Sequence, residues 1–228
     1  MMAKEVSMQA ITIPTDLERR KEDYPLITGQ AHFVDDVRLP ARWPAVLHMA
    51  VVRSPYAHAA ITHVSLDQAM SLPGVAAAFS GADLVNDLRL LANAVPVPGL
   101  KQPVRRPLAV SKVHYVGDAV AVVLAESPVV AEDALDLVEV DYVPLPAVVD
   151  PEAALAQDAP LLYEDFGSNV AFESHSGGGD IAAVFAQADY TLKLRLVNQR
   201  LAPSSLEPRA CLFDLDPHTG QLIRKEAN

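Results

Sequence analysis

Several short stretches of this 228-residue chain combine residue types that could do chemistry. Arg53, Ser54 and His58 bring a guanidinium, a hydroxyl and an imidazole close together, which is a set suited to nucleophilic catalysis. A serine nucleophile also needs a strained elbow such as G-x-S-x-G and an acid that orients the histidine, and this stretch shows neither. Because Pro55 follows it, Ser54 is predicted to be a turn residue rather than a nucleophile.

A run of three glycines, 177–179, precedes Asp180 and an apolar stretch. Glycines before a helix can free backbone amides to bind phosphate. The run lacks the Lys-Ser/Thr pair of a P-loop and the spacing G-x-G-x-x-G. We therefore predict a flexible turn that leads into a short amphipathic helix with Asp180 as its N-cap.

Adjacent acids occur at Asp35 and Asp36 and again at Glu132 and Asp133. Neighbouring side chains on a strand point to opposite faces, and adjacent acids on a helix usually face solvent. Neither pair therefore has the geometry of a carboxylate dyad for general acid–base catalysis.

The seven histidines and the one cysteine form no metal-binding pattern. His58 and His63 are an odd number of residues apart, so on a strand they would point to opposite faces. A single cysteine excludes a disulfide framework within the chain and an all-cysteine zinc or iron–sulfur site. We expect Cys211 to be a small apolar core residue.

A polar cluster lies near the end of the sequence, in the stretch 196–222. It gathers Asn198, Gln199, Arg200, Glu207 and Arg209 around two prolines and leads into a strand-like stretch. The residue types alone leave two interpretations open, a binding site or a turn between two strands.

Most of the elements that must position these residues are predicted to be short strands, with a few short helices between them, which predicts an α+β fold. Strands are predicted within 30–34, 45–55, 59–66, 75–81, 114–126, 139–150, 190–200 and from 211, and helices within 67–72, 128–138 and after 180. The strand in 45–55 is expected to be covered on both faces, that in 139–150 to lie at a sheet edge, and that in 190–200 to have one wet face.

Turn residues separate these elements. Asp67 is predicted to cap the helix at 67–72, and Gly117 with Asp118 is predicted to form a turn. Four prolines make 93–107 a surface loop. The composition changes near Asp150, where we place the boundary between two structural units.

The composition restricts the possible partners. Half of the residues are apolar, so the chain can build a core, and the formal net charge is −11. This charge argues against binding nucleic acids or anionic membranes. The first twenty residues contain no apolar run and no run is long enough to span a bilayer, so a soluble cytoplasmic protein is expected.

Six stretches, taken together and in order, resemble a known family. They are EDYPLITGQAHFVDDVRLP, LHMAVVRSPYAHAAITHV, PGVAAAFSGADL, RPLAVSKVHYVGDAVAVVLAES, AEDALDLVEVDYVPLPAVVD and NQRLAPSSLEPRACLFDLDPHTGQL. The order is similar to that in the molybdenum-containing large subunit of the xanthine dehydrogenase and aldehyde oxidase superfamily, especially in large chains like that of aerobic carbon monoxide dehydrogenase.

The resemblance implies three parts: a polar N-terminal arm at 1–21, an α/β-hammerhead domain at 22–150, and the incomplete beginning of a molybdopterin-binding domain at 151–228. In this family the hammerhead is mainly structural, and the cofactor loops and the active-site glutamate lie several hundred residues further on. Glu207 and Arg209 match the family's E-P-R turn, and we expect a buried, salt-bridged turn rather than cofactor ligands.

No catalytic, cofactor-binding or metal-binding residue is therefore predicted in this chain. Candidates for a structural or subunit-interface role are Asp35, Asp36, Arg53, Tyr115, Gly117, Glu207 and Arg209.

The resemblance leaves two hypotheses. In the first, the chain is the structural N-terminal portion of a molybdenum hydroxylase that oxidises or hydroxylates an aldehyde, an N-heterocycle or CO. A second polypeptide would then hold molybdenum on molybdopterin cytosine dinucleotide, and partner subunits would hold iron–sulfur clusters and FAD. In the second, it is a truncated, non-catalytic scaffold or an orphan gene fragment that only binds partner subunits. In both, the isolated chain is expected to bind no cofactor and to be inactive.

Overall fold

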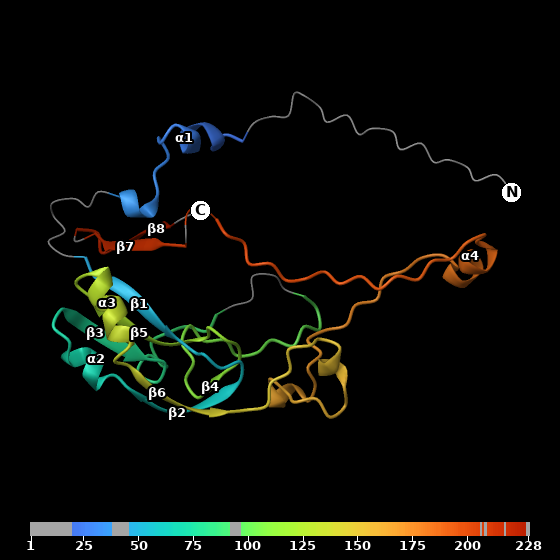
Figure 1. Ribbon diagram of the computed structural model, residues 1–228, viewed down its shortest axis with the longest axis horizontal. Coiled ribbons are helices and arrows are strands. Elements are labelled where there is room, and N and C mark those ends of the chain that lie inside the picture. Colours follow the sequence, from blue (N-terminus) through green and yellow to red (C-terminus); the bar gives the residue numbers. More distant parts are fainter. Residues whose placement is uncertain are drawn as a thin grey trace. The chain divides into compact units, whose positions relative to one another are not determined.

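The computed structural model describes residues 20–37, 46–91, 97–205, 207, 209–216 and 218–226. Nearly all of the predicted arm at 1–21 and part of the predicted loop at 93–107 lie outside these residues. The chain divides into two compact units, Arg42–Leu192 and a smaller one that joins Met1–Ala41 to Lys193–Asn228. Figure 1 shows the course of the chain through their helices and strands.

The larger unit contains two antiparallel sheets of three strands each. The first has the order β1-β5-β3, with β1 at His48–Arg53, β5 at Ala119–Ala125 and β3 at Val75–Ser80. The second has the order β4-β2-β6, with β4 at Lys112–Val113, β2 at Ala59–Ser65 and β6 at Glu139–Pro144. The predicted edge position of the strand in 139–150 is confirmed.

Two helices, α2 (Asp67–Ser71) and α3 (Pro128–Leu135), pack on the first sheet (Figure 1). Helix α3 begins with Pro128, and the Ser127 side chain accepts a hydrogen bond of 3.2 Å from the Val130 N–H. Proline at the first position and serine at the N-cap are both favoured there, because the first N–H groups of a helix have no partner inside it. The buried residues of α3 are alanines, which let it lie close to the sheet.

The core alternates along β5, as the period of a strand requires. Val123 packs against Ala69 of α2 and Ala134 of α3. Val120, on the other face of the strand, packs against Ala59 and Val113 of the second sheet. Strand β5 therefore connects the helical layer to the second sheet.

After β6 the larger unit continues in loops with two short 3₁₀ helices, η2 (Ala153–Leu155) and η3 (Glu164–Phe166). Asn169 organises this part: its Oδ1 accepts a hydrogen bond from the Leu162 N–H, and its Nδ2 donates to the Ala154 and Pro160 carbonyls. Helix α4 follows at Ile181–Gln187, and Asp180 accepts from the Ala183 N–H, which confirms the predicted N-cap.

The smaller unit contains helix α1 (Asp23–Ile27), the 3₁₀ turn η1 (Val34–Asp36) and a hairpin. Its strands are β7 (Cys211–Leu215) and β8 (Leu222–Glu226), which pair antiparallel with Cys211 opposite Glu226. The Asp216 carboxylate closes the turn by accepting from the His218 and Thr219 N–H groups.

The α+β class is confirmed, but the predictions for three segments are wrong. Residues 190–200 are extended and exposed and pair with no described strand, so alternation alone did not make a strand. Residues 30–34 contain no strand and lead into η1, after the short helix α1 that was not predicted. In the described part of the chain strand β1 is covered on one face, because Ala50 is buried whereas Met49, which points to the opposite face, is 60% exposed.

Three local predictions are also corrected. Asp67 is the first residue of α2 and not its cap, since the N-cap is Leu66 without a side-chain bond. Cys211 is exposed, because it lies in a hairpin with no covering layer among the described residues. Gly117 and Asp118 form the predicted turn, but β4 on one side of it pairs with β2 and not with β5.

Candidate functional site

Arg53 and Gly117, two of the candidate residues, meet where β1 ends. The Ser54 N–H donates to the Asp118 carbonyl, the Gly117 N–H donates to the Ser54 carbonyl, both at 2.8 Å, and the Arg53 Nη1 donates to the Gly117 carbonyl at 3.0 Å. Gly117 has a φ of 92°, a conformation that glycine adopts without strain. Arg53 therefore fastens a glycine turn that lies 64 residues further along the chain.

Tyr115 lies on the same turn and is 55% exposed. The Asp118 Oδ2 accepts a hydrogen bond of 3.1 Å from the His114 N–H, so its carboxylate lies inside the turn. Partial burial, and then the Asp118 charge, raise the pKa of the Tyr115 hydroxyl, while Arg105 and Arg53 oppose this. The result is an exposed tyrosine among charges of both signs, a residue type that is common in protein interfaces.

Ser54 and His58 do not form a catalytic pair. The Ser54 Oγ accepts from the Tyr56 N–H at 3.0 Å and donates to the Tyr56 carbonyl, which confirms that Ser54 is a turn residue. The His58 Nδ1 is 2.8 Å from the Pro146 carbonyl oxygen. His58 is buried and His63 is exposed, but the alternation behind the predicted opposite faces does not hold, because a register shift between Ile61 and His63 places Ala59, Ile61 and Val64 in one cluster.

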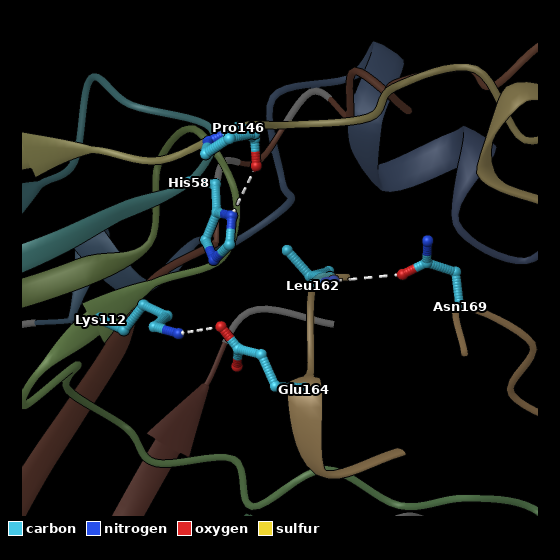
Figure 2. A network of polar contacts seen from close by, with 6 residues as sticks. All are labelled: His58, Lys112, Pro146, Leu162, Glu164 and Asn169. Carbon is cyan, nitrogen blue, oxygen red and sulfur yellow. Dashed lines mark hydrogen bonds and ion pairs between the residues drawn. The ribbon is translucent and has the colours of Figure 1, made fainter. Parts of the chain in front are cut away.

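A row of four rings, which we call the ring row, is formed by His58, His114, Tyr163 and Phe166. The centroids of neighbouring rings are 6.0, 4.6 and 5.6 Å apart in that order. Beside it, the Lys112 Nζ and Glu164 Oε1 form an ion pair at 2.7 Å. Figure 2 shows this ion pair near His58 and its bond to Pro146. Nothing in the spacing of the sequence links Tyr163 to His114, so sequence reasoning missed this cluster.

Two open grooves lie on the larger unit. One of about 380 Å³ is lined by His114, Tyr115, Tyr163 and the loop 102–106, and contains charges of both signs. The other, of about 470 Å³, is lined by β2 and residues 80–83. There the Asp83 carboxylate accepts from the Ser80 Oγ and N–H, which lower the pKa of Asp83. The Asp83 carboxylate therefore stabilises the loop 80–83 and is already occupied by Ser80.

In the smaller unit, Glu207 and Asp36 bind backbone. The Glu207 Oε1 accepts a hydrogen bond of 2.9 Å from the Val34 N–H, 173 residues away in the sequence. The Asp36 Oδ2 accepts one of 2.9 Å from the Phe33 N–H within η1, and the adjacent Asp35 lies in the same turn. Arg209 is exposed, and no ion pair joins it to Glu207 in the described part of the chain, so the buried, salt-bridged turn is wrong.

The described residues offer no set of side chains that could bind a metal ion directly, and the single cysteine of the chain cannot hold an iron–sulfur cluster. No group of three or more His, Cys, Asp or Glu in the described part of the chain could hold a metal ion. Glycines 177–179 are exposed, and the helix after them has only seven residues, so they form no cradle for a phosphate. Among the described helices, none is long and apolar enough to cross a membrane.

Comparisons with known proteins agree on one family. Residues 28–146 match the family of the a/b hammerhead domain of aldehyde oxidase and xanthine dehydrogenase. The carbon monoxide dehydrogenase large chain of Hydrogenophaga pseudoflava is 38% identical over 215 residues, which are 89% of this chain and 26% of that protein. The gamma subunit of the 6-hydroxypseudooxynicotine dehydrogenase complex of Paenarthrobacter nicotinovorans is 36% identical over 87% of this chain and 25% of that protein.

Solved structures show the same likeness. Quinoline 2-oxidoreductase from Pseudomonas putida 86 matches with a TM-score of 0.79 and 32% identity over 90% of this chain and 25% of that one. The Cu,Mo-CO dehydrogenase in its carbon monoxide reduced state matches with a TM-score of 0.69 and 35% identity. The match covers 90% of this chain and 26% of that one. The chain thus spans about a quarter of the length of these relatives, and the predicted hammerhead fold is confirmed.

Proposed function

The chain belongs to the α/β-hammerhead family of aldehyde oxidases and xanthine dehydrogenases, and from this premise we propose that it is the structural N-terminal portion of a molybdenum hydroxylase large subunit. The rest of the large subunit would hold molybdenum on molybdopterin cytosine dinucleotide. Further subunits would hold iron–sulfur clusters and FAD, and the assembly would work in the cytoplasm. It would oxidise or hydroxylate an aldehyde, an N-heterocycle or CO.

One observation carries the structural role: three of the candidate side chains, Asp36, Arg53 and Glu207, form hydrogen bonds with the backbone of the chain itself. Arg53 donates to the Gly117 carbonyl, and Glu207 accepts from the Val34 N–H. A polar group that already satisfies a backbone partner is costly to redirect toward a ligand, because the partner loses its hydrogen bond. These residues therefore hold the fold rather than a cofactor.

The bond between Glu207 and Val34 would link the two domains that we propose, whose boundary near 150 lies inside the larger compact unit. It joins the segment before 150 to the segment after 151 within the smaller unit. We propose that 22–150 is the hammerhead domain and 151–228 the beginning of the molybdopterin-binding domain. In this arrangement the E-P-R turn fastens the entry into the second domain.

Among the candidates whose side chains the structure describes, Tyr115 and Arg209 remain for contacts with other subunits. Tyr115 and Arg209 are exposed, and tyrosine and arginine are enriched at the centres of interfaces. We propose that they contact partner polypeptides of the assembly.

Co-expression tests the proposal. The chain would be produced with a polypeptide that supplies the rest of the large subunit and with the iron–sulfur and FAD subunits, and the purified complex would be analysed for molybdenum. A stable complex that contains both this chain and molybdenum is expected, and it should oxidise one of the three substrate classes. A complex without molybdenum would instead support the scaffold hypothesis, and recovery of this chain alone would contradict both.

A variant pair tests the role of Glu207 separately. Glu207→Ala removes the acceptor of the Val34 N–H, so hydrogen exchange at the Val34 amide should become about tenfold faster or more. Glu173→Ala, at an exposed position, is the matched control and should leave it unchanged. Equal exchange in both variants would remove the evidence for a structural Glu207.

A further inference from the structure

Strand β6 has an outer edge that no described strand covers. On its inner side it pairs with β2, which also pairs with β4. The Ile61 N–H of β2 donates to the Ser111 carbonyl, just before β4, at 2.9 Å and therefore points away from β6. Tyr142 lies opposite Ile61, so its N–H and C=O point away from β2, and those of Val140, two residues earlier, point the same way. The outer edge of β6 thus presents the backbone of Val140 and Tyr142 to another strand.

Residues 190–200 are a second stretch that pairs with no described strand. Their backbone is extended and exposed. The apolar side chains lie two residues apart and are all exposed: Tyr190, Leu192, Leu194 and Leu196. Lys193 and Arg195 alternate with them, so a strand formed here would have one apolar face and one basic face. Such a strand is stabilised by a neighbour that covers its apolar face and places acids beside its cations.

Strand β6 has the complementary pattern. Val140 and Tyr142 pack against the core cluster of the second sheet. Glu139 and Asp141 alternate with them and are exposed. The Glu139 carboxylate accepts a hydrogen bond from the Gln68 Nε2, whereas the Asp141 carboxylate has no hydrogen-bond or ion-pair partner among the described residues. Strand β6 is therefore apolar toward the core and acidic toward the solvent.

One antiparallel register matches both faces of the two stretches. Lys193 then lies opposite Asp141 on the solvent face, and Leu194 lies opposite Val140 on the core face. The opposed pairs in this register are Thr191–Val143, Leu192–Tyr142, Lys193–Asp141, Leu194–Val140 and Arg195–Glu139. A slip by one residue would turn the leucines to the solvent and the cations to the core, so the pattern selects this register.

Other pairings of 190–200 are less favourable. If the stretch paired with its own copy around Leu194, Lys193 would lie opposite Arg195, and like charges opposite each other destabilise a strand pair. Among the strands at the edges of the described sheets, β1, β3 and β4 contain no acid, and β7 and β8 contain one each. Strand β6 contains two on one face. Charge and apolar pattern therefore both favour β6.

We propose that residues 191–195 of one copy of the chain add to β6 of a second copy as an antiparallel strand, and that the mutual exchange forms a dimer. The occupant is a second copy because every copy carries both complementary stretches, and the structure leaves both without a partner strand among the described residues at these edges. The dimer goes beyond the proposed function, since both stretches belong to this chain and no other subunit is required.

The dimer is expected to be weak. Two additions of short strands form a small interface, and the net charge of −11 on each copy opposes association. We expect monomers at about 5 µM and mostly dimers at about 300 µM, which corresponds to a dissociation constant of roughly 0.1 mM. Denaturation of the dilute chain therefore measures the monomer.

Sedimentation equilibrium of the full chain over this concentration range tests the dimer. The average mass should rise from that of one chain toward that of two. A mass of one chain at every concentration would overturn the proposal, and so would growth beyond two chains, because a strand addition that is not mutual continues into open assemblies.

Charge variants test the register. Asp141→Lys places a cation opposite Lys193 in both additions and should weaken the dimer about tenfold. Asp158→Lys changes the net charge equally at an exposed position outside both stretches, and it should not weaken the dimer. Combining Asp141→Lys with Lys193→Asp restores opposite charges and should restore the dimer. Equal behaviour of Asp141→Lys and Asp158→Lys, or no recovery in the double variant, would show that this strand pair does not form.

Hydrogen exchange of the unaltered chain locates the contact without a substitution. The amides of Val140 and Tyr142 should exchange about threefold more slowly, or slower still, at about 300 µM than at about 5 µM, because the added strand accepts their hydrogen bonds. The β5 amides at 119–125, in the centre of a sheet, should exchange equally at both concentrations. A dimer that leaves Val140 and Tyr142 unchanged uses another surface and contradicts the proposal.

Discussion

Strand β5 and residues 190–200 were both predicted to be strands, but β5 is wholly apolar, 190–200 alternates apolar and polar residues, and their surroundings are opposite. Strand β5 lies between β1 and β3 and has ladder bonds on both sides. Its residues Val120 and Val123 are fully buried on opposite faces. In 190–200, Tyr190 and Leu192 are 90% and 78% exposed, and the backbone pairs with no described strand.

The difference shows what makes an extended stretch a strand. Strand β5 has neighbouring strands that satisfy its N–H and C=O groups, and layers that cover its apolar side chains. In the described part of the chain, 190–200 has neither strand neighbours nor a covering layer. The apolar residues of 190–200 remain available to a partner, because an unpaired edge with alternating apolar side chains is a template for strand pairing.

The helices α3 and α4 repeat this contrast. Both have a side-chain N-cap, Ser127 for α3 and Asp180 for α4. Helix α3 buries Ala131 and Ala134 against the first sheet, whereas Val184 of α4 is 69% exposed. Local capping is equivalent in the two helices, and only packing distinguishes them.

The largest expected loss of stability is at Gly81, which follows β3 directly and donates its N–H to the Val120 carbonyl of β5. A Cβ at Gly81 would lie 2.1 Å from the Ala109 carbonyl oxygen, and the backbone at that point cannot move away cheaply. Gly81→Ala should lower the free energy of unfolding by about 3 kcal/mol or more. Gly178→Ala, at a site with no atom within 4 Å, should be nearly neutral. Both would be measured by urea denaturation, and a neutral Gly81→Ala would show that the region around β5 is not closely packed.

A smaller effect is expected from removing buried methyl groups in β5. Val123→Ala leaves a cavity against Ala69 and Ala134 and should cost about 2 kcal/mol. Leu194→Ala, in the stretch 190–200, should change stability by less than about 0.5 kcal/mol because Leu194 is 66% exposed. Similar losses in the two variants would mean that 190–200 is covered in solution, for example by a second copy, which light scattering would reveal.

The smallest effect compares the two helix caps. Ser127→Ala removes the acceptor of the Val130 N–H and should lower the stability of the larger unit by about 1 kcal/mol. Asp180→Ala removes the equivalent bond to Ala183 but should leave the main unfolding transition in place, because α4 has no buried residue. Circular dichroism would then show only a local loss of helix. A shift of the main transition by Asp180→Ala would indicate that α4 packs against another part of the molecule.

Local signals in the sequence predicted much of the fold. The helix within 128–138, the apolar run of β5 and the aspartate before α4 each depend on a few neighbouring residues, and these predictions are confirmed. The candidate residues could be selected from the resemblance to a family, but their contacts could not. The bond from Val34 to Glu207 crosses 173 residues, and no periodicity encodes such a pair.

The sequence by itself determined the α+β class and the positions of the capped helices and most strands, because these depend on short-range patterns of apolar and turn residues, and its resemblance to known proteins indicated the hammerhead family. Only the tertiary structure decided that 190–200 forms no ladder with any described strand, that Cys211 is exposed, and that His58, His114 and Tyr163 form one row. The physical reason is that burial and strand pairing are properties of what lies beside a residue in space, and the same local pattern occurs with and without a neighbour.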